Sequence, residues 1–300
     1  MQKKQVWSQV DGVLLLDKAE GLTSNTALQK ARRLFNAAKG GHTGTLDPMA
    51  TGLLPLCFGE ATKFSADLLE ADKSYEAEVF LGATTNTGDR EGVVTATASV
   101  TCGRADIELA LQRFTGDILQ VPPMYSALKR EGQPLYALAR QGREVERAPR
   151  PVTIRALELL AWQSPIFTLR VTCSKGTYIR VLAEDLGKTL GCGAHLTALR
   201  RTRVGALDLA DAHTLAELET LTGDALAACL LPPDRLLSSL PAVHLSDAAA
   251  LQRFKNGNPV PAPPGVQGEA RVYGEAGLLG VGMVKADGLL WPKRIRHNAV

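Results

Sequence analysis

The 300-residue sequence is poor in cysteine and contains no long apolar segment. Its five cysteines are scattered without a CxxC pair, and their odd number argues against a disulfide framework. The N-terminal stretch MQKKQVWSQV lacks the apolar core of a signal peptide, and no later run approaches the ~20 apolar residues of a membrane-spanning helix. We therefore expect a cytoplasmic protein that is neither exported nor embedded in a membrane.

Charge of one sign is also scarce, because the formal net charge is only +3. Residues 129–155 nevertheless carry seven basic and three acidic side chains, a local net charge of +4 that leaves about −1 for the remainder. Such an excess attracts phosphates, although a run of charge is as often only a solvated face. Prolines bound this basic segment, about residues 122–152, which predicts a lid that closes over a ligand.

Hydrophobic periodicity predicts an α+β or mixed-sheet protein. Residues 11–18 read as a buried strand, and alternating apolar residues predict half-buried strands at 74–82 and 166–173. Helical spacing follows Thr23 and recurs at 105–116 and 178–190. These elements interleave without a regular βαβ repeat, which argues against a doubly wound fold. Beyond Leu240, a short helix, a proline-rich turn and short strands predict a separate small β domain, so we place the domains at 1–242 and 243–300.

The stretch GGHTGTLDPMATGLLPLCFG concentrates polar residues and glycines ahead of an apolar run. Pro48 restricts the backbone of Asp47, which holds that carboxylate in a narrow range of directions. A phosphate-binding P-loop would need a lysine that is missing, and a phosphoryl-accepting aspartate would precede the TGT element rather than follow it. A metal site would recruit His42 and Asp47, but neither Asp89 nor Asp185 stands at a ligand spacing. An Asp-Pro pair also starts many ordinary turns.

This stretch resembles the catalytic motif of the tRNA pseudouridine synthases of the TruB family, which isomerise uridine 55 in the tRNA T-arm. Three further segments fit the same family in order and spacing: LDKAEGLTSN, VPPMYSALKREGQPLYALARQG and CSKGTYIRVLAEDLG. The match covers roughly residues 11–205. The resemblance implies a mixed, mostly antiparallel sheet in a catalytic domain with the basic lid as an insertion, followed by a PUA-like RNA-binding domain.

The resemblance also assigns roles to individual residues. Asp47 matches the catalytic nucleophile, and Arg180 matches the arginine that pairs with it. Tyr75 matches the residue that stacks on the flipped uracil and handles a proton. The guanidinium suits its role because a carboxylate in a dry pocket tends to protonate unless a cation offsets its desolvation.

Substrate contacts are implied for a second set of residues. Tyr178 and Leu199 match pocket walls, and His42 matches the residue that fills the gap left by the departing base. The motif segments and basic runs supply the other expected contacts: Lys18, Arg140, Arg143 and Arg200. We also expect phosphate contacts from Arg201, from Arg203 and from the terminal segment KRIRH.

The implied reaction requires no cofactor and no metal, because uridine and pseudouridine differ only in which uracil atom is joined to the sugar. The expected partner is the T-arm of tRNA, which the protein also helps to fold, and we expect a monomer without an obligate protein partner. Two alternatives stay open. One is a guide-RNA-directed pseudouridine synthase subunit, and the other is a noncatalytic RNA-binding or RNA-folding module.

Overall fold

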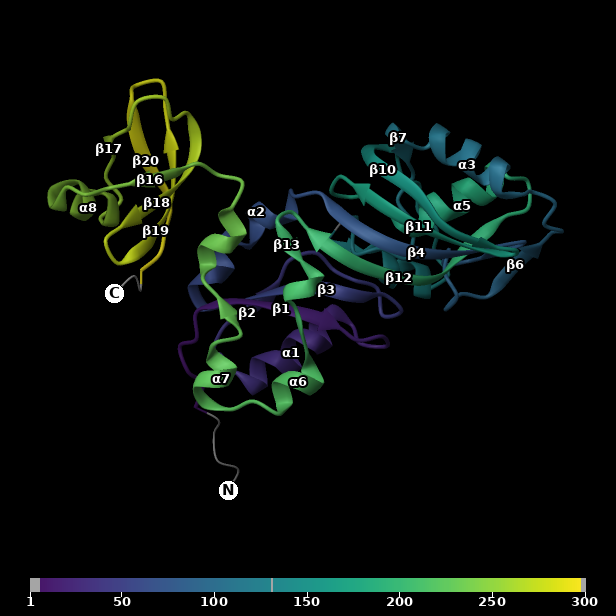
Figure 1. Cartoon of the computed structure of the whole chain (residues 1–300), viewed down its shortest axis with the longest axis horizontal. Helices are drawn as coiled ribbons and strands as arrows, with labels where there is room; N and C mark the ends of the chain where they lie inside the picture. Colours follow the sequence, from purple (N-terminus) through teal and green to yellow (C-terminus); the bar gives the residue numbers. More distant parts are fainter. Residues whose placement is uncertain (1–5, 131, 298–300) are drawn as a thin grey trace.

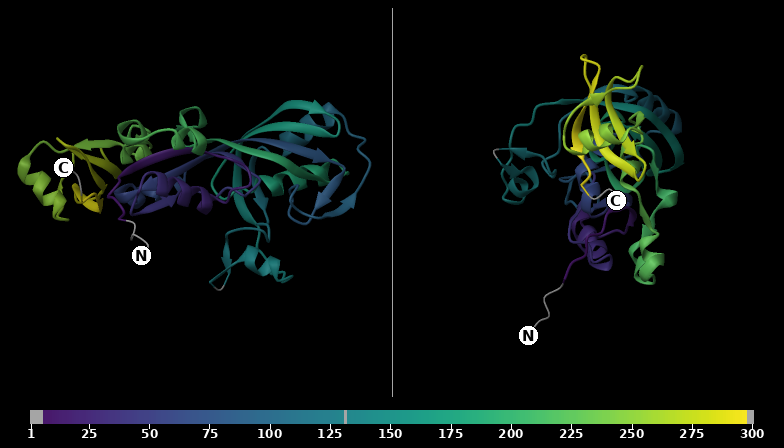
Figure 2. Two further views of the ribbon diagram at one scale, coloured as in Figure 1. Left: turned by 90° about the horizontal axis from the view of Figure 1, so that it is seen from below. Right: turned by 90° about the vertical axis from the view of Figure 1, so that its left-hand side faces the viewer.

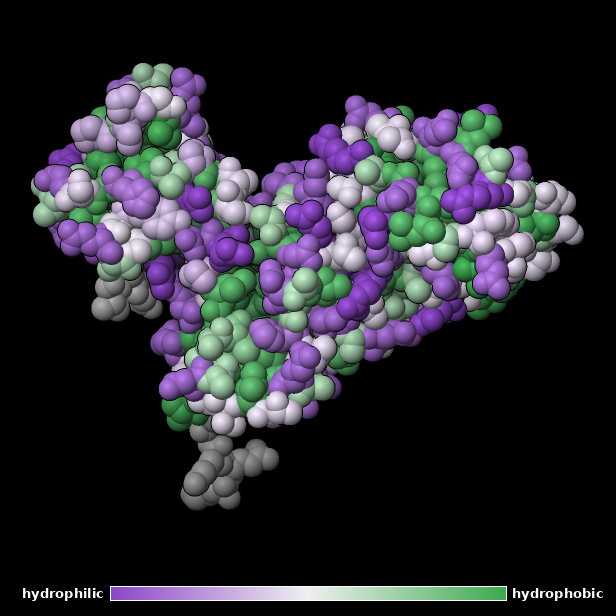
Figure 3. Space-filling model, in the orientation of Figure 1, coloured by the Kyte–Doolittle hydropathy of each residue, from purple (hydrophilic) through white to green (hydrophobic). Residues whose placement is uncertain are grey.

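The computed structural model describes residues 6–130 and 132–297. Its strands form one large sheet of eleven strands and a separate five-stranded sheet near the C-terminus (Figure 1). On the face shown in Figure 3, a notch separates the lobe that contains the small sheet from the lobe built around the large one. None of the helices in the described part combines the length and apolar character needed to cross a bilayer.

The large sheet is mixed and mostly antiparallel, with the strand order β14-β1-β3-β12-β4-β11-β10-β7. Two contacts on this path are parallel, β1 with β14 and β12 with β3. The path strands are β1 (Gly12–Lys18), β3 (Thr51–Phe58), β4 (Lys73–Leu81), β7 (Gly116–Gln120), β10 (Arg150–Gln163), β11 (Ile166–Cys173), β12 (Ala194–Val204) and β14 (His213–Thr214). Short strands pair beside it: β2 (Gly40–His42), β13 (Leu207–Asp208) and β15 (Leu230–Leu231). The predicted α+β class and sheet type are confirmed.

Strands β4 and β11 lie side by side in the centre of this sheet and alternate as predicted. In both strands every second residue is buried, including Tyr75 and Leu169. Their register pairs Val171 with Tyr75 and Leu169 with Ala77, so the buried faces coincide. The apolar faces then build one core on the side of the sheet that carries α5.

Helices cover the sheet and connect its strands. Helix α1 (Ser24–Leu34) begins where predicted, since the Thr23 side chain caps it by accepting a hydrogen bond from Thr26 N at 3.0 Å. Helix α5 (Ile179–Thr189) buries its predicted apolar stripe. The other helices are α2 (Ser65–Leu69), α3 (Arg104–Arg113), α4 (Leu135–Arg140), α6 (Leu215–Glu219), α7 (Gly223–Ala227) and α8 (Ala248–Lys255), with 3₁₀ turns η1 (Gly59–Phe64), η2 (Leu209–Asp211) and η3 (Pro233–Leu237).

The segment from 121 to 149 leaves the sheet between β7 and β10. It holds α4 and the small hairpin of β8 (Lys129–Arg130) and β9 (Gln133–Pro134), and it projects away from the body of the molecule (Figure 2, left). A second hairpin, β5 (Ala83–Thr85) with β6 (Val94–Thr97), extends from the end of β4. The insertion is therefore placed as the predicted lid would be, and its role in closure stays a prediction.

The C-terminal sheet has its own small core and also packs against the part of the chain that contains the large sheet, here called the catalytic body. It contains β16 (Ala242–His244), β17 (Val260–Pro261), β18 (Gly268–Gly274), β19 (Gly277–Val284) and β20 (Leu289–Ile295). Leu278 and Val281 join the core formed by Val13 and its neighbours on the far face of the large sheet. Arg294 forms a bidentate pair with Asp67, at 2.5 and 2.7 Å.

The predicted phosphate contacts of the terminal segment are wrong for its two arginines. Arg294 faces Asp67 as described, and Arg296 pairs with Asp11 at 2.7 Å. Both side chains are 21% exposed and pair with carboxylates of the large-sheet part of the chain. Their charges are already compensated within the protein, so they are poorly placed for the predicted phosphate contacts.

Candidate active site

Asp47 lies in the loop between β2 and β3, and hydrogen bonds fix this loop on both sides of it. On one side, Ser24 Oγ accepts a hydrogen bond from Leu46 N at 2.8 Å and donates one to Leu46 O at 3.1 Å. On the other side, Pro48 O accepts a hydrogen bond from Lys18 Nζ at 3.2 Å. The direction of the carboxylate is thus set by its neighbours, in agreement with the restriction that Pro48 predicts.

Lys18 is one of these anchors, and the predicted contact of Lys18 with substrate is wrong. Its relative exposure is 0%, and Nζ also donates to Ala19 O at 2.9 Å and Leu22 O at 2.7 Å. Burial lowers the pKa of Lys18 to about 8, although Asp47 opposes the shift. A side chain enclosed on all sides cannot meet RNA, so Lys18 acts on the site by holding the loop that carries Asp47.

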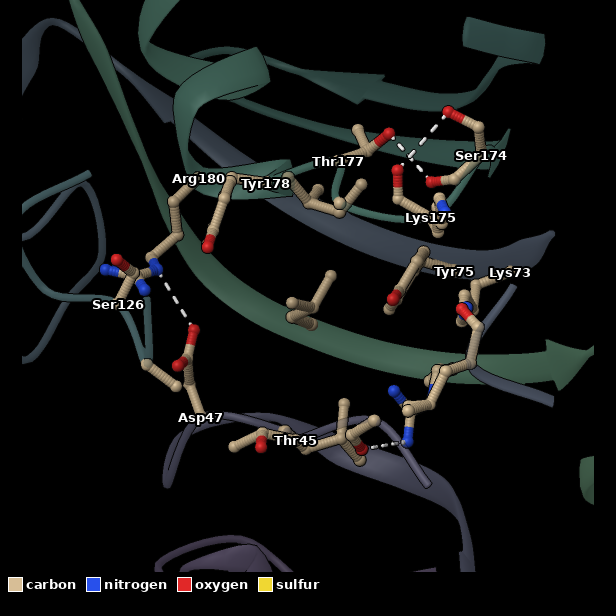
Figure 4. A pocket seen from close by; sticks show the side chains of 18 residues that line it. Thr45, Asp47, Lys73, Tyr75, Ser126, Ser174, Lys175, Thr177, Tyr178 and Arg180 are labelled. Atoms are coloured by element: carbon tan, nitrogen blue, oxygen red, sulfur yellow. Dashed lines mark hydrogen bonds and ion pairs between the residues drawn. The ribbon is translucent and has the colours of Figure 1, made fainter. Parts of the chain in front are cut away.

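Arg180 reaches Asp47 from the first turn of α5. Its Nε lies 3.0 Å from Asp47 Oδ2, and Figure 4 marks this ion pair with a dashed line. The Arg180 side chain is only 5% exposed, and it donates from Nη1 to Thr87 O at 2.8 Å and from Nη2 to Tyr125 O at 2.7 Å. Three separate segments therefore hold one guanidinium, which cannot turn away without leaving buried polar groups unpaired.

Asp89 is a second carboxylate on the same guanidinium, with Oδ2 3.6 Å from Arg180 Nε. Its Oδ1 accepts hydrogen bonds from Thr87 Oγ1 at 2.6 Å and from Glu91 N at 3.1 Å, and its side chain is 5% exposed. Burial raises the pKa of Asp47, Arg180 opposes the rise and Asp89 adds to it. Asp47 therefore protonates at a higher pH than an exposed aspartate does.

A cavity of about 270 Å³ opens beside the Asp47–Arg180 pair (Figure 4). Tyr75 on β4 and Leu199 on β12 line it and are 9% and 7% exposed, and Tyr178, the residue before α5, also lines it. Tyr75 and Leu199 lie on the same face of two neighbouring strands, where they offer an aromatic and an apolar surface on which a planar ring can stack. Burial raises the pKa of both tyrosines, so both hydroxyls keep their protons at neutral pH.

Arg201 lies beneath the catalytic loop, and its predicted phosphate contact is wrong. It is 2% exposed and donates from Nε to Leu53 O at 2.8 Å and from Nη2 to Gly44 O at 3.0 Å. Gly44 has φ +76°, and a Cβ there would lie 3.3 Å from Arg201 Nη1. The absence of a side chain at Gly44 thus allows the loop and the arginine to approach closely.

Two other predicted cations of this strand lie nearer to the surface. Arg200 is paired with Asp17 at 2.6 Å and does not line the cavity that Asp47 lines. Arg203 lies 3.5 Å from Asp208 in an exposed pair. A solvated pair of this kind exchanges partners at little energetic cost, so contacts with phosphates stay a prediction for both arginines.

His42 ends β2 and is half-buried, but it does not line the cavity. Its Nδ1 is buried without a hydrogen-bond partner among the described residues. Burial lowers the pKa of His42, and Arg201 lowers it further, so the ring is neutral at neutral pH. Its predicted role, filling the space left by the base, stays a prediction.

The two lid arginines that the sequence singled out are exposed. Arg140 lies with its guanidinium 5.6 Å from the centre of the Tyr136 ring, and Arg143 follows α4 on the surface. Neither forms an ion pair with any residue in the described ranges. Both charges are therefore available to an anionic partner, as predicted for phosphate contacts.

Within residues 6–130 and 132–297, no three His, Cys, Asp or Glu side chains cluster as metal ligands would. The arrangement provides instead a held carboxylate, a buried cation beside it and a small pocket with an aromatic wall. Such a set can supply a nucleophile and bind a planar ring while it limits the access of water.

Three family models match the chain in succession. They describe the N-terminal domain of TruB family pseudouridylate synthases at residues 32–179, the tRNA pseudouridylate synthase B C-terminal domain at 180–238, and the C-terminal region of pseudouridine synthase II TruB at 241–295. A protein named tRNA pseudouridine synthase B from Dechloromonas aromatica (strain RCB) is 64% identical over 295 residues, which cover 98% of each chain.

The chain belongs to the TruB family of pseudouridylate synthases. The members of this family are isomerases, and the predicted family and enzyme class are confirmed. A TruB relative of the same printed name, from Aromatoleum aromaticum, is 58% identical over 95% of this chain and 92% of its own. Among solved structures, a chain of a Cbf5-Nop10-Gar1 complex is 27% identical with a TM-score of 0.71, over 91% of this chain and 78% of that one.

Three buried residues of the TruB site were not predicted from the sequence. Asp89 was considered only as a metal ligand, Arg201 was assigned to the surface, and Ser126 on the lid was not singled out, although it lines the cavity. The sequence did contain a sign that Arg201 is buried, because it stands two positions after Leu199 and so shares its face of β12. No such pattern indicated burial of Asp89 or Ser126, because both lie in irregular segments.

Proposed function

We propose that the protein isomerises uridine 55 in the T-loop of tRNA to pseudouridine, by turning the nucleotide out of its loop into the cavity beside Asp47. The observation that carries the proposal is the 3.0 Å contact of Arg180 Nε with Asp47 Oδ2 at a cavity with Tyr75 on its wall. The TruB relatives named tRNA pseudouridine synthase B support tRNA as the substrate.

The reaction breaks the bond from uracil N1 to ribose C1′ and forms one from C5 to C1′. The proton on C5 leaves, N1 gains one, and nothing is oxidised or reduced. Asp47 supplies the nucleophile in its ionised form, and Arg180 favours that form against the desolvation of the pocket. The fixed loop holds the carboxylate in one direction, which lowers the entropic barrier to attack.

The pocket keeps the detached uracil in place while it turns. Stacking on Tyr75 contributes about 1–3 kcal/mol, which offsets much of the few kcal/mol needed to unstack the base from its loop. Tyr75 keeps its hydroxyl proton at neutral pH, so it would act as a relay: its oxygen takes the C5 proton while its own proton passes to uracil N1. Leu199 and Tyr178 restrict the access of water to the exposed glycosidic carbon.

Contacts with tRNA fall to the lid and the C-terminal domain. Arg140 and Arg143 project from the catalytic body on the lid, where phosphates of a T-arm would lie above the cavity. A single-stranded loop is the expected target because the deep groove of A-form RNA hides the base edges. We assign the small β domain to a further part of the same tRNA, and we expect a monomer to suffice.

The test is a reaction of the purified protein with an unmodified tRNA transcript and no other RNA. We expect pseudouridine at position 55 only, and none when cytidine replaces that uridine. Asp47→Asn is expected to bind the transcript and form no product. A requirement for an added guide RNA would refute the proposal and favour the guide-directed alternative. Product formation by Asp47→Asn would refute the assignment of Asp47 as the nucleophile.

A further inference from the structure

Ser126 is a buried polar residue of the lid that faces the active-site cavity. Its relative exposure is 6%, and its Oγ has no hydrogen-bond partner among the described residues. It lines the cavity together with Asp47 and Tyr178, and Figure 4 shows it beside Arg180. Buried hydroxyls are nearly always paired, so this one points to a partner that arrives with a ligand.

The main chain around Ser126 connects the lid with the catalytic pair. Ser126 O accepts a hydrogen bond from Tyr136 N at 3.1 Å, in the first turn of α4, the helix that carries Arg140. One residue earlier, Tyr125 O accepts the 2.7 Å hydrogen bond from Arg180 Nη2. The position of Ser126 is thus fixed from both sides, by the lid helix and by the arginine that pairs with Asp47.

The surroundings of the hydroxyl indicate which part of a nucleoside it would meet. Ser126 lies at the end of the cavity where Arg180 contacts Asp47, and Tyr75 lies further along (Figure 4). With the uracil on Tyr75 and C1′ near Asp47, the polar atoms closest to this end are the ribose 2′-hydroxyl and the uracil 2-oxo group.

We propose that Ser126 is a substrate-binding residue that the lid contributes to the pocket, through a hydrogen bond from its hydroxyl to the 2′-hydroxyl or the 2-oxo group of the flipped uridine. The proposal rests on the proposed function. The hydroxyl is already held at the cavity by α4 and by Arg180, so the uridine would meet it in a fixed position.

Ser126→Ala tests the hydroxyl, with Ser126→Thr as the variant that keeps it. Ser74→Ala is the matched control, because Ser74 lies on β4 and its hydroxyl bonds Thr172 Oγ1 at 2.9 Å, outside the cavity. We expect the single-turnover rate of Ser126→Ala to fall about tenfold, the loss typical of one hydrogen bond, with the Kd for tRNA within about twofold of wild type. Ser126→Thr should recover most of the rate, and Ser74→Ala should keep it.

A wild-type rate in Ser126→Ala would overturn the proposal, and so would equal losses in the Ala and Thr variants with a matching fall in Tm. A tRNA with 2′-deoxyuridine at position 55 locates the contact. The penalty of Ser126→Ala disappears on this substrate if the partner is the 2′-hydroxyl and persists if it is the 2-oxo group. Failure of the wild-type protein itself to modify tRNA would refute the proposed function, whereas an active wild type with an equally active Ser126→Ala refutes this inference alone.

Discussion

Replacing Asp89 with asparagine tests whether a second negative charge is required beside the Asp47–Arg180 pair. The substitution keeps the shape of the side chain but not its acceptors. Oδ2 faces Arg180 Nε at 3.6 Å, and Oδ1 accepts hydrogen bonds from Thr87 Oγ1 and Glu91 N. An asparagine must therefore direct its NH₂ group at one of these donors, and either choice leaves two donors facing each other.

The size of the effect follows from the distance and the burial. Two unit charges 3.6 Å apart interact by about 4.6 kcal/mol at an effective dielectric constant of about 20. Arg180 keeps Asp47 and two main-chain carbonyls as partners, so only part of this energy is lost. A hydrogen bond to a charged group is worth about 1.5–3 kcal/mol, which corresponds to a fall in the single-turnover rate of roughly 10- to 100-fold.

The pH profile separates this electrostatic role from a packing role. Asp89 raises the pKa of Asp47, because two like charges near each other oppose ionisation. In the proposed function Asp47 reacts in its ionised form, so the rate is expected to fall as the pH drops through its pKa. In Asp89→Asn the plateau should be lower, while the acid limb of the profile should move to lower pH.

The assay is the single-turnover formation of pseudouridine in a tRNA transcript, followed across acidic and neutral pH. Asp185→Asn is the control, since Asp185 sits on α5 as well but pairs with Lys188 at 2.9 Å on the exposed side. A plateau equal to that of the wild type, or an acid limb that moves to higher pH, would refute the reasoning.

Four further outcomes are expected. The wild-type rate should fall with decreasing pH at a value above the ordinary pKa of 3.8, because burial raises the pKa of Asp47; a pH-rate profile checks this. Neutralising Arg140 and Arg143 should reduce the slope of log Kd against log salt concentration by the amount expected for about two phosphate contacts. An unchanged slope would show that they are ordinary surface residues. Lys18 loses its proton at lower pH in the folded protein than in the unfolded one, so its contribution to stability should rise between about pH 8 and 10.5. Urea unfolding should therefore show a stability difference between wild type and Lys18→Met that grows over this range, because Lys73, whose pKa burial also lowers to about 8, titrates in both proteins. Arg294→Gln should lower the free energy of unfolding by about 1–3 kcal/mol and expose β20 to hydrogen exchange, while equal protection would refute its docking role.

The parts of the site that the sequence predicted are those set by local patterns. Alternation along β4 placed Tyr75 on the buried face, and the proline after Asp47 indicated a fixed carboxylate. The pairing of Asp47 with Arg180 came from the family motifs, because no local pattern links residues on two distant segments. The structure brings the two side chains to 3.0 Å.

The parts that the sequence did not predict depend on packing between distant segments. Arg201 was taken for a surface cation, since three arginines in the run LRRTRV look like a solvated stripe. The register of β12 against β4 instead pairs Arg201 with Tyr75, on the buried side of the sheet. Burying an arginine is unfavourable unless its N–H groups find hydrogen-bond acceptors. The main-chain carbonyls of Leu53 and Gly44 accept these hydrogen bonds only once the loop has folded.

The same reasoning indicates which charges are left for the RNA. Arg294 and Arg296 are paired with carboxylates of the catalytic body, and Leu278 packs into the core beneath them. The small sheet is therefore held to the large one by apolar burial as well as by ion pairs, and its orientation toward the cavity is fixed. Among the described residues, neither Arg140 nor Arg143 on the lid forms an ion pair, so we expect the salt dependence of binding to arise there. Helix α4, which carries Arg140, also bonds the main chain of Ser126, so the proposed phosphate contacts would act on the segment that lines the cavity.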